Sequence, residues 1–346
     1  MQPPTIRMTW SGTSWGVAPQ PAAAQAATAT TGVHALAGRS MGTQWSVKLV
    51  ADAAALPELE RGIQARLDEV VAQMSPWEAD SEISRYNRAE AGTVQALPDG
   101  FYAVLDAALK LAADSGGAYD PTIGPLVNLW GFGPDGARAA APSDAAIAQA
   151  QSRVGWQRVG FDPLARTATQ SGGLYLDFSS IAKGYGVDRV AEWLGERGVA
   201  AFLVEVGGEL YGRGRKPDGS AWRIAVERPA GDARDDDGAA VLALDGYAIA
   251  TSGDYRRYFD HDGRRYSHTV DPRSGRPVTH ALASVSVLHP QCMQADGLAT
   301  VLAVLGPQAG MAYANRRQLA AMFVLHDGDG FLTRMTPAFI ARQRAA

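Results

Sequence analysis

The sequence predicts an α+β fold of mixed, largely antiparallel sheets packed with helices. Past residue 38, apolar patterns of period two and of period 3.6 alternate without a long linker. The middle of the chain is rich in strand patterns joined by turns, and helical patterns return toward the C-terminus. Long antiparallel strands mixed with helices are typical of this class rather than of a doubly wound sheet. We therefore expect residues 39–346 to form a single domain.

Apolar periodicity places the individual elements. A helix is expected over residues 99–114, and Ser143 is expected to cap a short one. The apolar face of an earlier amphipathic helix is formed by Leu59, Ile63, Leu67, Val70 and Met74. Later helices are expected over about 293–305 and 307–318. Strands are expected at 44–50, 174–178, 222–227, 241–253, 264–271, 283–289 and 320–326.

Composition excludes several classes of protein. The formal net charge of the 346-residue chain is -4, which does not suit a nucleic-acid binder that works by bulk electrostatics. Cys292 is the single cysteine, so an intrachain disulfide and a cysteine-based metal cage are both impossible. No apolar run is long enough to suggest a transmembrane segment. Any anionic ligand must therefore be held by local features of a water-exposed fold.

The first residues of the sequence stand apart from the fold. Residues 1–38 are rich in Ala, Pro and Thr and contain no continuous apolar stretch of the kind found in a signal peptide. Two interpretations remain open, a disordered lead-in and the remnant of an export signal.

Residues 176–194, "LDFSSIAKGYGVDRVAEWL", form the most unusual segment. An apolar strand is expected to end at Asp177 and to lead through two serines into a helix. The first turn of that helix holds Lys183, Gly184 and Gly186, although a lysine there opposes the helix dipole and glycines weaken a helix. Free backbone N–H groups at a helix start bind anions. A ligand-driven first turn is one interpretation of this segment, and a surface lysine with structural glycines is the simpler one from these residues alone.

Two further clusters could carry chemistry. His268 ends a strand three residues before Asp271, next to a Pro-Arg-Ser-Gly turn, so it is either a catalytic base or a turn histidine bonded to Asp271. Asp296 and Thr300 are four residues apart on a predicted helix and therefore share a face. Such a pair of oxygen ligands suits Mg²⁺. Taken alone, the pair is explained more simply by a capping aspartate and a core-facing threonine.

Three softer signals complete the set. Trp77 lies in a polar segment and could stack on a flat ring or pack in the core. Tyr119 and Asp120 lie in a constrained Gly/Pro-rich stretch, 116–136, which is too apolar for an ordinary surface loop. The acidic run at 231–238 is interpreted as a solvated hairpin loop rather than a metal site.

Taken together, these segments resemble the ApbE family, the FAD:protein FMN transferases. The resemblance extends in family order from about residue 40 to 305. It rests on the blocks "SMGTQWSVKL", "MSPWEADSEISRYNR", "GGAYDPTIGPL", "LDFSSIAKGYGVDRVAEWL", "EVGGELYGRG", "AIATSGDYRRYF", "SHTVDPRSGRPV" and "ADGLAT". It implies an ApbE-like fold and a Mg²⁺-dependent transfer of the FMN half of FAD to a Ser or Thr hydroxyl of an acceptor flavoprotein, with release of AMP.

The resemblance also implies roles for individual residues. His268 matches the general base, and the metal ligands match Asp296, Thr300 and the backbone carbonyl of Ala182. The positions that match FAD contacts are Met41, Trp77, Ala118, Tyr119, Asp120, Asp177, Ser180, Lys183, Thr269 and Asp271. The position of Trp77 is often tyrosine in the family, so a hydroxyl is absent here.

Alternatives to the transferase remain. The same site with water as acceptor would make a Mg²⁺-dependent FAD pyrophosphatase that gives FMN and AMP, and a site without turnover would make an FAD-binding protein. Family precursors are commonly exported lipoproteins, which implies the periplasm or cell envelope, with the cytoplasm as the alternative. The sequence has no lipobox cysteine.

Overall fold

The structure of the chain is a computed structural model. It describes residues 31–138, 140–226, 240–253, 258–261, 264–328 and 330–344. Residues 1–30 and the acidic run at 231–238 lie outside the described residues. The first strand begins at Thr31, upstream of the boundary expected at residue 39.

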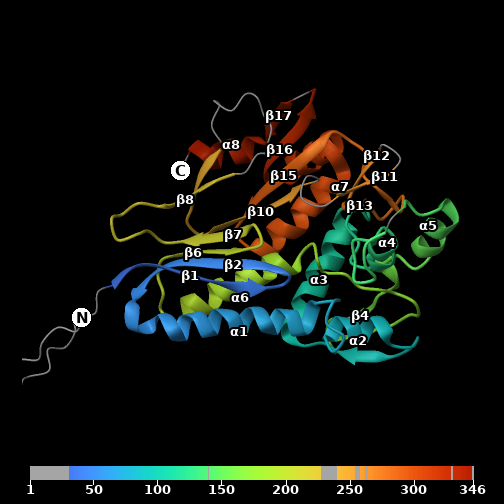
Figure 1. The fold of residues 1–346 in the computed structure, drawn as a ribbon, viewed down its shortest axis with the longest axis horizontal. Helices are drawn as coiled ribbons and strands as arrows, with labels where there is room; N and C mark the ends of the chain where they lie inside the picture. The colour runs from blue at the N-terminus through green and yellow to red at the C-terminus, as the bar shows by residue number, and fades with distance from the viewer. Residues whose placement is uncertain are drawn as a thin grey trace, which may run out of the picture.

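A large antiparallel sheet organises the molecule (Figure 1). Its strands lie in the order β1-β2-β6-β7-β10-β15-β16-β17, and each neighbouring pair is antiparallel. Their bounds are Thr31–Ser40 (β1), Thr43–Asp52 (β2), Phe202–Val206 (β6), Glu209–Arg213 (β7), Tyr247–Gly253 (β10), Leu282–His289 (β15), Ala320–Asp327 (β16) and Gly330–Met335 (β17). Small sheets pair β3-β5-β4 (Val94–Ala96, Thr167–Thr169, Gly160–Asp162), β8-β9 (Trp222–Ala225, Val241–Leu244), β11-β12 (Tyr258–His261, Arg264–Ser267) and β13-β14 (Val270–Asp271, Arg276–Pro277).

The helices cover the two faces of this sheet unequally. Their bounds are Leu56–Met74 (α1), Glu82–Arg88 (α2), Asp99–Asp114 (α3), Gly124–Leu129 (α4), Asp144–Gln151 (α5), Ala182–Glu196 (α6), Cys292–Arg316 (α7) and Pro337–Arg344 (α8). Helices α1, α6 and α7 pack together on one face, and α8 with the β8–β9 hairpin covers part of the other. Antiparallel strands with segregated helices confirm the predicted α+β class.

The sequence placed most elements correctly. α3 spans the predicted residues 99–114, and Ser143 caps α5 by accepting from the backbone N–H of Ala146. The five residues predicted for the apolar face of α1 are its buried residues. Amphipathic periodicity succeeds here because each helix has one face toward the core.

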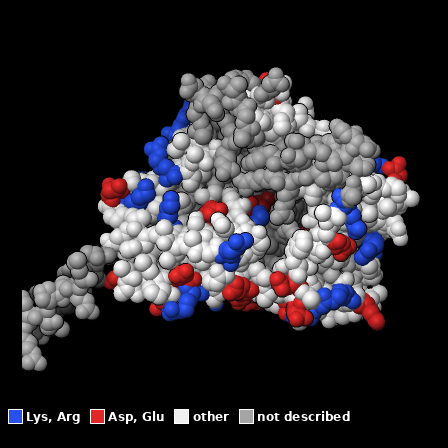
Figure 2. All heavy atoms as spheres, viewed as in Figure 1, with Lys and Arg blue, Asp and Glu red and all other residues white. Residues whose placement is uncertain are grey.

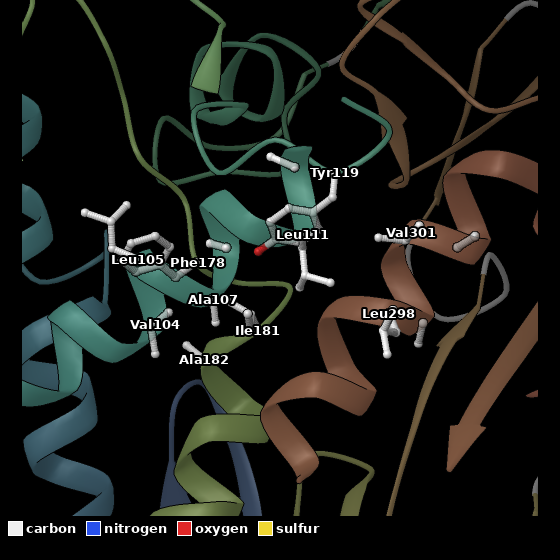
Figure 3. Close-up of a cluster of buried hydrophobic side chains, with 14 of the residues drawn as sticks. Val104, Leu105, Ala107, Leu111, Tyr119, Phe178, Ile181, Ala182, Leu298 and Val301 are labelled. Atoms are coloured by element: carbon white, nitrogen blue, oxygen red, sulfur yellow. The ribbon is translucent and has the colours of Figure 1, made fainter. Parts of the chain in front are cut away.

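The main core lies where α3, the start of α6 and α7 meet. Figure 3 shows Leu105 and Phe178 beside each other and Tyr119 next to Leu111, with Leu298 of α7 on the other side of the cluster. All of these side chains are buried. The core therefore fixes the start of α6 against α7, the two helices that carry the predicted anion and metal residues.

The predicted strand at residues 174–178 is wrong. These residues are largely buried, but they belong to no helix or strand and pair with no strand among the described residues. Side chains and loops satisfy the backbone instead: the N–H of Leu176 donates to Asn87 Oδ1 at 2.7 Å, the Asn87 amide donates to the Leu176 carbonyl at 2.9 Å, and the N–H of Asp177 donates to the Pro121 carbonyl at 2.8 Å. Burial makes an apolar run look like a strand whether or not it has a ladder partner.

Helix α7 contains the kink that its sequence predicts. Gly306 has a φ of 74°, and Pro307 follows it inside the helix, which divides α7 as the two expected helices are divided. Pro307 has no N–H to donate to the carbonyl of Ala303. The Nε2 of His280 takes its place at 2.9 Å. α7 is also long and apolar enough to span a membrane by length and composition, but most of it is buried as a core helix.

Packing explains Gly184 in the first turn of α6, which corrects the ligand-driven interpretation for this residue; Gly186 is less restricted. A Cβ on Gly184 would lie 2.4 Å from the backbone oxygen of Cys292 at the start of α7. On Gly186, a Cβ would lie 3.2 Å from a methyl of Leu67 and 3.3 Å from the sulfur of Met41. Gly184 thus permits two helices to approach at backbone distance, whereas Gly186 faces side chains.

The difference between these glycines gives a stability prediction. Gly184→Ala should lower the free energy of unfolding by about 1–3 kcal/mol, because backbone atoms cannot move aside as side chains do. Gly186→Ala is the matched control and should be close to neutral, since the helix propensity gain of alanine, about 1 kcal/mol, offsets a mild clash. Urea denaturation of both variants measures this. Equal effects would contradict the packing explanation.

Candidate active site

A charged cluster joins α6, α7 and β7. The Lys183 Nζ lies 2.7 Å from Glu209 Oε1 and 3.9 Å from Asp296 Oδ1. Glu209 and Asp296 are buried, and the side chain of Lys183 is 29% exposed. Figure 2 shows basic and acidic atoms together in a hollow near the middle of one face, where Figure 1 places β7 beside α7. The lysine and the aspartate, predicted from separate blocks, thus belong to one charged cluster, whose surroundings we call the pocket.

The two helices of this pocket cap each other. Asp296 Oδ2 on α7 accepts from the N–H of Gly184 at 2.9 Å, in the first turn of α6. In return, Asp188 on α6 accepts from the N–H groups of Cys292 and Met293, at 2.7 and 2.8 Å, in the first turn of α7. Each carboxylate satisfies backbone donors that a helix start leaves free. The arrangement fixes the position of Asp296 relative to Lys183.

Thr300 connects this pocket to the region of the predicted base. Its Oγ1 lies 3.4 Å from Ser252 Oγ. Ser252 and Thr269 both line a small cavity of about 10 Å³, enough for about one water molecule. Thr269 follows His268, which lies just after β12 with its ring edge-on to Phe132 at a centroid distance of 6.2 Å.

Tyr119 and Ser180 meet just before the first turn of α6. The Ser180 hydroxyl donates to Tyr119 Oη at 3.3 Å. Tyr119 and Ala118 are buried, and burial raises the pKa of Tyr119 above its ordinary value, so the phenol remains neutral. Asp177 is buried and accepts from the N–H of Ser179 at 2.7 Å, which shapes the turn before α6.

Asp120 organises its own loop. Its Oδ1 accepts from the N–H and the hydroxyl of Thr122 at 2.8 and 2.7 Å, and its Oδ2 accepts from the N–H of Trp156 at 3.1 Å. Burial raises its pKa, and these hydrogen bonds oppose the shift. The carboxylate therefore shapes the "AYD" turn that the sequence singled out.

The remaining predicted residues lie at different distances from the charged cluster. Met41 has a φ of 53° in the turn between β1 and β2, and its sulfur lies against Gly186 on α6. Asp271 pairs with Arg273 at 2.8 Å. Trp77 follows α1 and is 58% exposed, so it does not fill the core. Within the described part of the chain, Lys183 forms ion pairs with Glu209 and Asp296. Asp271 is therefore not an ion-pair partner of Lys183, and Trp77 has no charge with which to form such a pair.

Electrostatics favour a charged lysine in the pocket. Burial lowers the pKa of Lys183, but the charges of Asp296 and Glu209 and the hydrogen bond to Glu209 together outweigh it and raise this pKa. Burial raises the pKa of Glu209 to about 7, against the stabilising charge of Lys183. The Oε2 of Glu209 is buried, and within the described ranges no group forms a hydrogen bond with it. One ammonium thus faces two buried carboxyl groups.

The donor atoms fit a hard divalent cation. Asp296 supplies a carboxylate, Thr300 supplies a hydroxyl one turn later, and Ala182 begins α6 next to Lys183. Mg²⁺ prefers such oxygen ligands and usually takes few from the protein. The described residues contain no group of three His, Cys, Asp or Glu side chains that could hold a metal. The ligand set expected from the resemblance has one carboxylate, one hydroxyl and one backbone carbonyl, so it would not form a group of three such side chains.

Comparison with known proteins assigns the chain to a family. The model of the ApbE family matches residues 41–323. The chain belongs to the ApbE family. A relative from Haemophilus influenzae named FAD:protein FMN transferase is 39% identical over 318 residues, which cover 89% of this chain and 91% of the relative. One of the same name from Vibrio cholerae is 40% identical over 311 residues, with 89% and 91% covered. These findings confirm the resemblance.

Solved structures of the family share the fold. A flavinyl transferase ApbE from Pseudomonas stutzeri, in its apo form, is 43% identical and covers 91% of this chain and 98% of that chain, with a TM-score of 0.84. A flavin transferase ApbE from Vibrio cholerae is 38% identical over 90% of this chain and 100% of that chain, with a TM-score of 0.82. Both support the α+β, ApbE-like fold.

Sequence reasoning missed three residues of this ApbE site. Glu209 belongs to the block "EVGGELYGRG" but resembles Glu205, its neighbour across a Gly-Gly turn, and nothing local distinguishes which of them is buried. Ser252 is one hydroxyl among several in its strand. Asp188 could have been found, because it lies four residues after Gly184 and so shares its helix face.

Asp188 gives a pH-dependent stability prediction. Burial raises its pKa from 3.8 to about 6, and the two backbone hydrogen bonds oppose this shift. Between these values the folded chain binds a proton that the unfolded chain does not, so this group's contribution to stability falls as pH rises from about 4 to 6. Asp188→Asn removes the titration, so its stability relative to the wild type should rise by about 1–3 kcal/mol over this interval. Urea denaturation of both proteins at about pH 4 and pH 6 measures this difference in the free energy of unfolding. A difference between the two proteins that is the same at both pH values would contradict the prediction.

Proposed function

We propose that this chain transfers the FMN moiety of FAD to a Thr or Ser hydroxyl of an acceptor flavoprotein, with Mg²⁺ as cofactor and AMP as the released product. The single observation that carries the proposal is the proximity of Lys183 to Asp296, at 3.9 Å, across two helices that cap each other. Family membership supplies the reaction class, since the named relatives are FAD:protein FMN transferases.

The pocket suits the diphosphate of FAD. A bound Mg²⁺ would be held by Asp296, Thr300 and the carbonyl of Ala182, and would neutralise charge on phosphate oxygens. Lys183 is charged and partly exposed, so it can donate to the same oxygens. The diphosphate carries about two negative charges, which increase locally as the bond between the phosphates breaks. Positioned cations stabilise that charge best in a partly buried site.

The chemical step requires a base for the acceptor. The acceptor hydroxyl oxygen forms a bond to the phosphorus of the FMN half, and the bridging P–O bond breaks, so its electron pair leaves with AMP. The hydroxyl proton passes to His268. A threonine hydroxyl is a poor nucleophile at neutral pH, and general-base catalysis of this kind accelerates a reaction by about 10²–10⁴.

Other residues would bind and orient FAD. Tyr119 is held by Ser180 and, with Ala118, forms a buried wall beside the first turn of α6. Met41 lies against α6 from the β1–β2 turn. The exposed ring of Trp77 is available to stack on a flat ring of the ligand. Thr269 and Asp271 follow His268 and are proposed to lie beside the flavin.

A transfer assay tests this function. The purified chain is incubated with FAD, Mg²⁺ and a flavoprotein subunit that carries an acceptor threonine, and intact-protein mass spectrometry detects FMN on the acceptor. We expect covalent flavin on the acceptor and an equal amount of AMP, both abolished by EDTA. Free FMN and AMP formed equally fast without an acceptor would instead identify a pyrophosphatase. FAD that remains bound and intact would identify a binding protein.

A further inference from the structure

Glu209 contacts the proposed site but has no role in the function proposed above. It begins β7, directly after the Gly-Gly turn that follows β6. Its side chain is 4% exposed, and its Oε1 accepts from Lys183 at 2.7 Å. Burying a carboxylate costs several kcal/mol unless it is paired and hydrogen-bonded. A buried charge at this position therefore needs an explanation.

The pairing of Glu209 is incomplete. Lys183 satisfies Oε1, whereas Oε2 is buried and has no hydrogen-bond partner among the residues that the structure describes. Buried polar atoms in folded proteins nearly always have a partner, so the orphaned oxygen indicates a donor or cation that the described residues do not supply. This observation points to a ligand in the pocket independently of Asp296 and Thr300.

The charge balance points the same way. Among the described residues, the ion pairs place Lys183 between two carboxyl groups, those of Glu209 and Asp296, which leaves these three groups with one excess negative charge when both carboxyl groups are ionised. Without Glu209, the positive charge of Lys183 would balance the negative charge of Asp296, and no excess negative charge would remain. A pocket with an excess negative charge attracts a divalent cation and repels a diphosphate.

We propose that Glu209 is a positioning residue that holds Lys183 toward Asp296 and makes diphosphate binding depend on the divalent cation. The inference rests on the proposed function. By occupying Lys183, the Glu209 carboxylate prevents the lysine from attracting a free diphosphate. Once a divalent cation adds two positive charges, the pocket becomes net positive, and the two remaining protons of the Lys183 ammonium can be donated to phosphate oxygens.

Glu209→Gln tests this dependence because it keeps the shape and an oxygen that can accept from Lys183. Losing one negative charge should weaken Mg²⁺ binding about tenfold and strengthen FAD binding in EDTA about tenfold. A purely structural role would weaken both. Calorimetric titration of the apo chain with MgCl₂ and fluorescence titration of FAD in EDTA give the two affinities. Both are measured at about pH 8.5, above the pKa of Glu209, about 7.

Two further variants make the outcome decisive. Glu209→Asp keeps the charge but shortens the side chain, so it should not strengthen FAD binding in EDTA. Glu60→Gln, on the exposed face of α1, is the matched control for a lost glutamate charge and should change neither affinity. Circular dichroism verifies that each variant is folded.

The outcomes separate this inference from the proposed function. Opposite shifts for Mg²⁺ and FAD in Glu209→Gln support the role of Glu209. Affinities that both fall, or that both stay within about twofold of the wild type, overturn it. The proposed function itself is refuted if the wild-type chain does not bind FAD in the presence of Mg²⁺ and does not bind Mg²⁺ in the presence of FAD.

Discussion

Replacing His268 with alanine is expected to lower the rate of FMN transfer by about 10²–10⁴ while leaving FAD affinity within a few-fold of the wild type. The reason is that a general base contributes to the transition state and little to ground-state binding of FAD. Single-turnover transfer, followed by AMP release and by mass spectrometry of the acceptor, measures the rate. Fluorescence titration with FAD and Mg²⁺ measures binding.

A matched control for this variant is His289→Ala, on the last residue of β15, which should leave transfer unchanged. The role of His268 is refuted if its variant loses FAD affinity as much as transfer rate, because that result would indicate a binding residue. Unchanged transfer would show that another group accepts the proton.

Replacing Asp296 with asparagine should have the second large effect, a loss of transfer of about 10³ or more at moderate Mg²⁺. A bound divalent cation contributes several kcal/mol of charge stabilisation to phosphoryl chemistry, and each 1.36 kcal/mol is a factor of about ten in rate. Asparagine retains an oxygen that can accept from the N–H of Gly184, so the α6 cap can persist. The loss should therefore arise from metal affinity, measured as transfer rate against MgCl₂ concentration.

The controls for this experiment lie one turn along α7. Thr300→Ser keeps a hydroxyl and should retain most activity, whereas Thr300→Val removes it and should need more Mg²⁺ for half-maximal rate. The metal assignment fails if Asp296→Asn and the wild type show the same Mg²⁺ dependence.

Much of the fold could be predicted because its elements have one buried face. α1 and α3 follow the 3.6-residue period closely, and β2, β10, β15 and β16 of the large sheet lie where the apolar patterns place them, whereas β1, β6, β7 and β17 are not among the predicted strands. The prediction of a strand at 174–178 is wrong because a strand and a buried segment outside any sheet have the same apolar pattern. The two differ only in the hydrogen-bond partner of the backbone. That partner is Asn87, which is remote in sequence. Period and burial carry no information about such a partner.

The site was predicted in part, for a related reason. Lys183 and Asp296 belong to separate family blocks, and the structure brings them together. Gly184 was assigned to the ligand, but its missing Cβ makes room for the start of α7. Glu209 was not singled out, since its importance arises from a contact with Lys183 that only the paired strands and helices create.

The central claim is that Lys183, Asp296 and Thr300 form one cradle for a metal-bound diphosphate. A crystal structure of the chain with FAD and Mn²⁺, with anomalous diffraction to locate the metal, tests it most directly. We predict a metal peak bonded to both α7 side chains and to the Ala182 carbonyl, with a phosphate oxygen hydrogen-bonded to the lysine. A metal bound elsewhere, or a diphosphate remote from the lysine, would contradict the account.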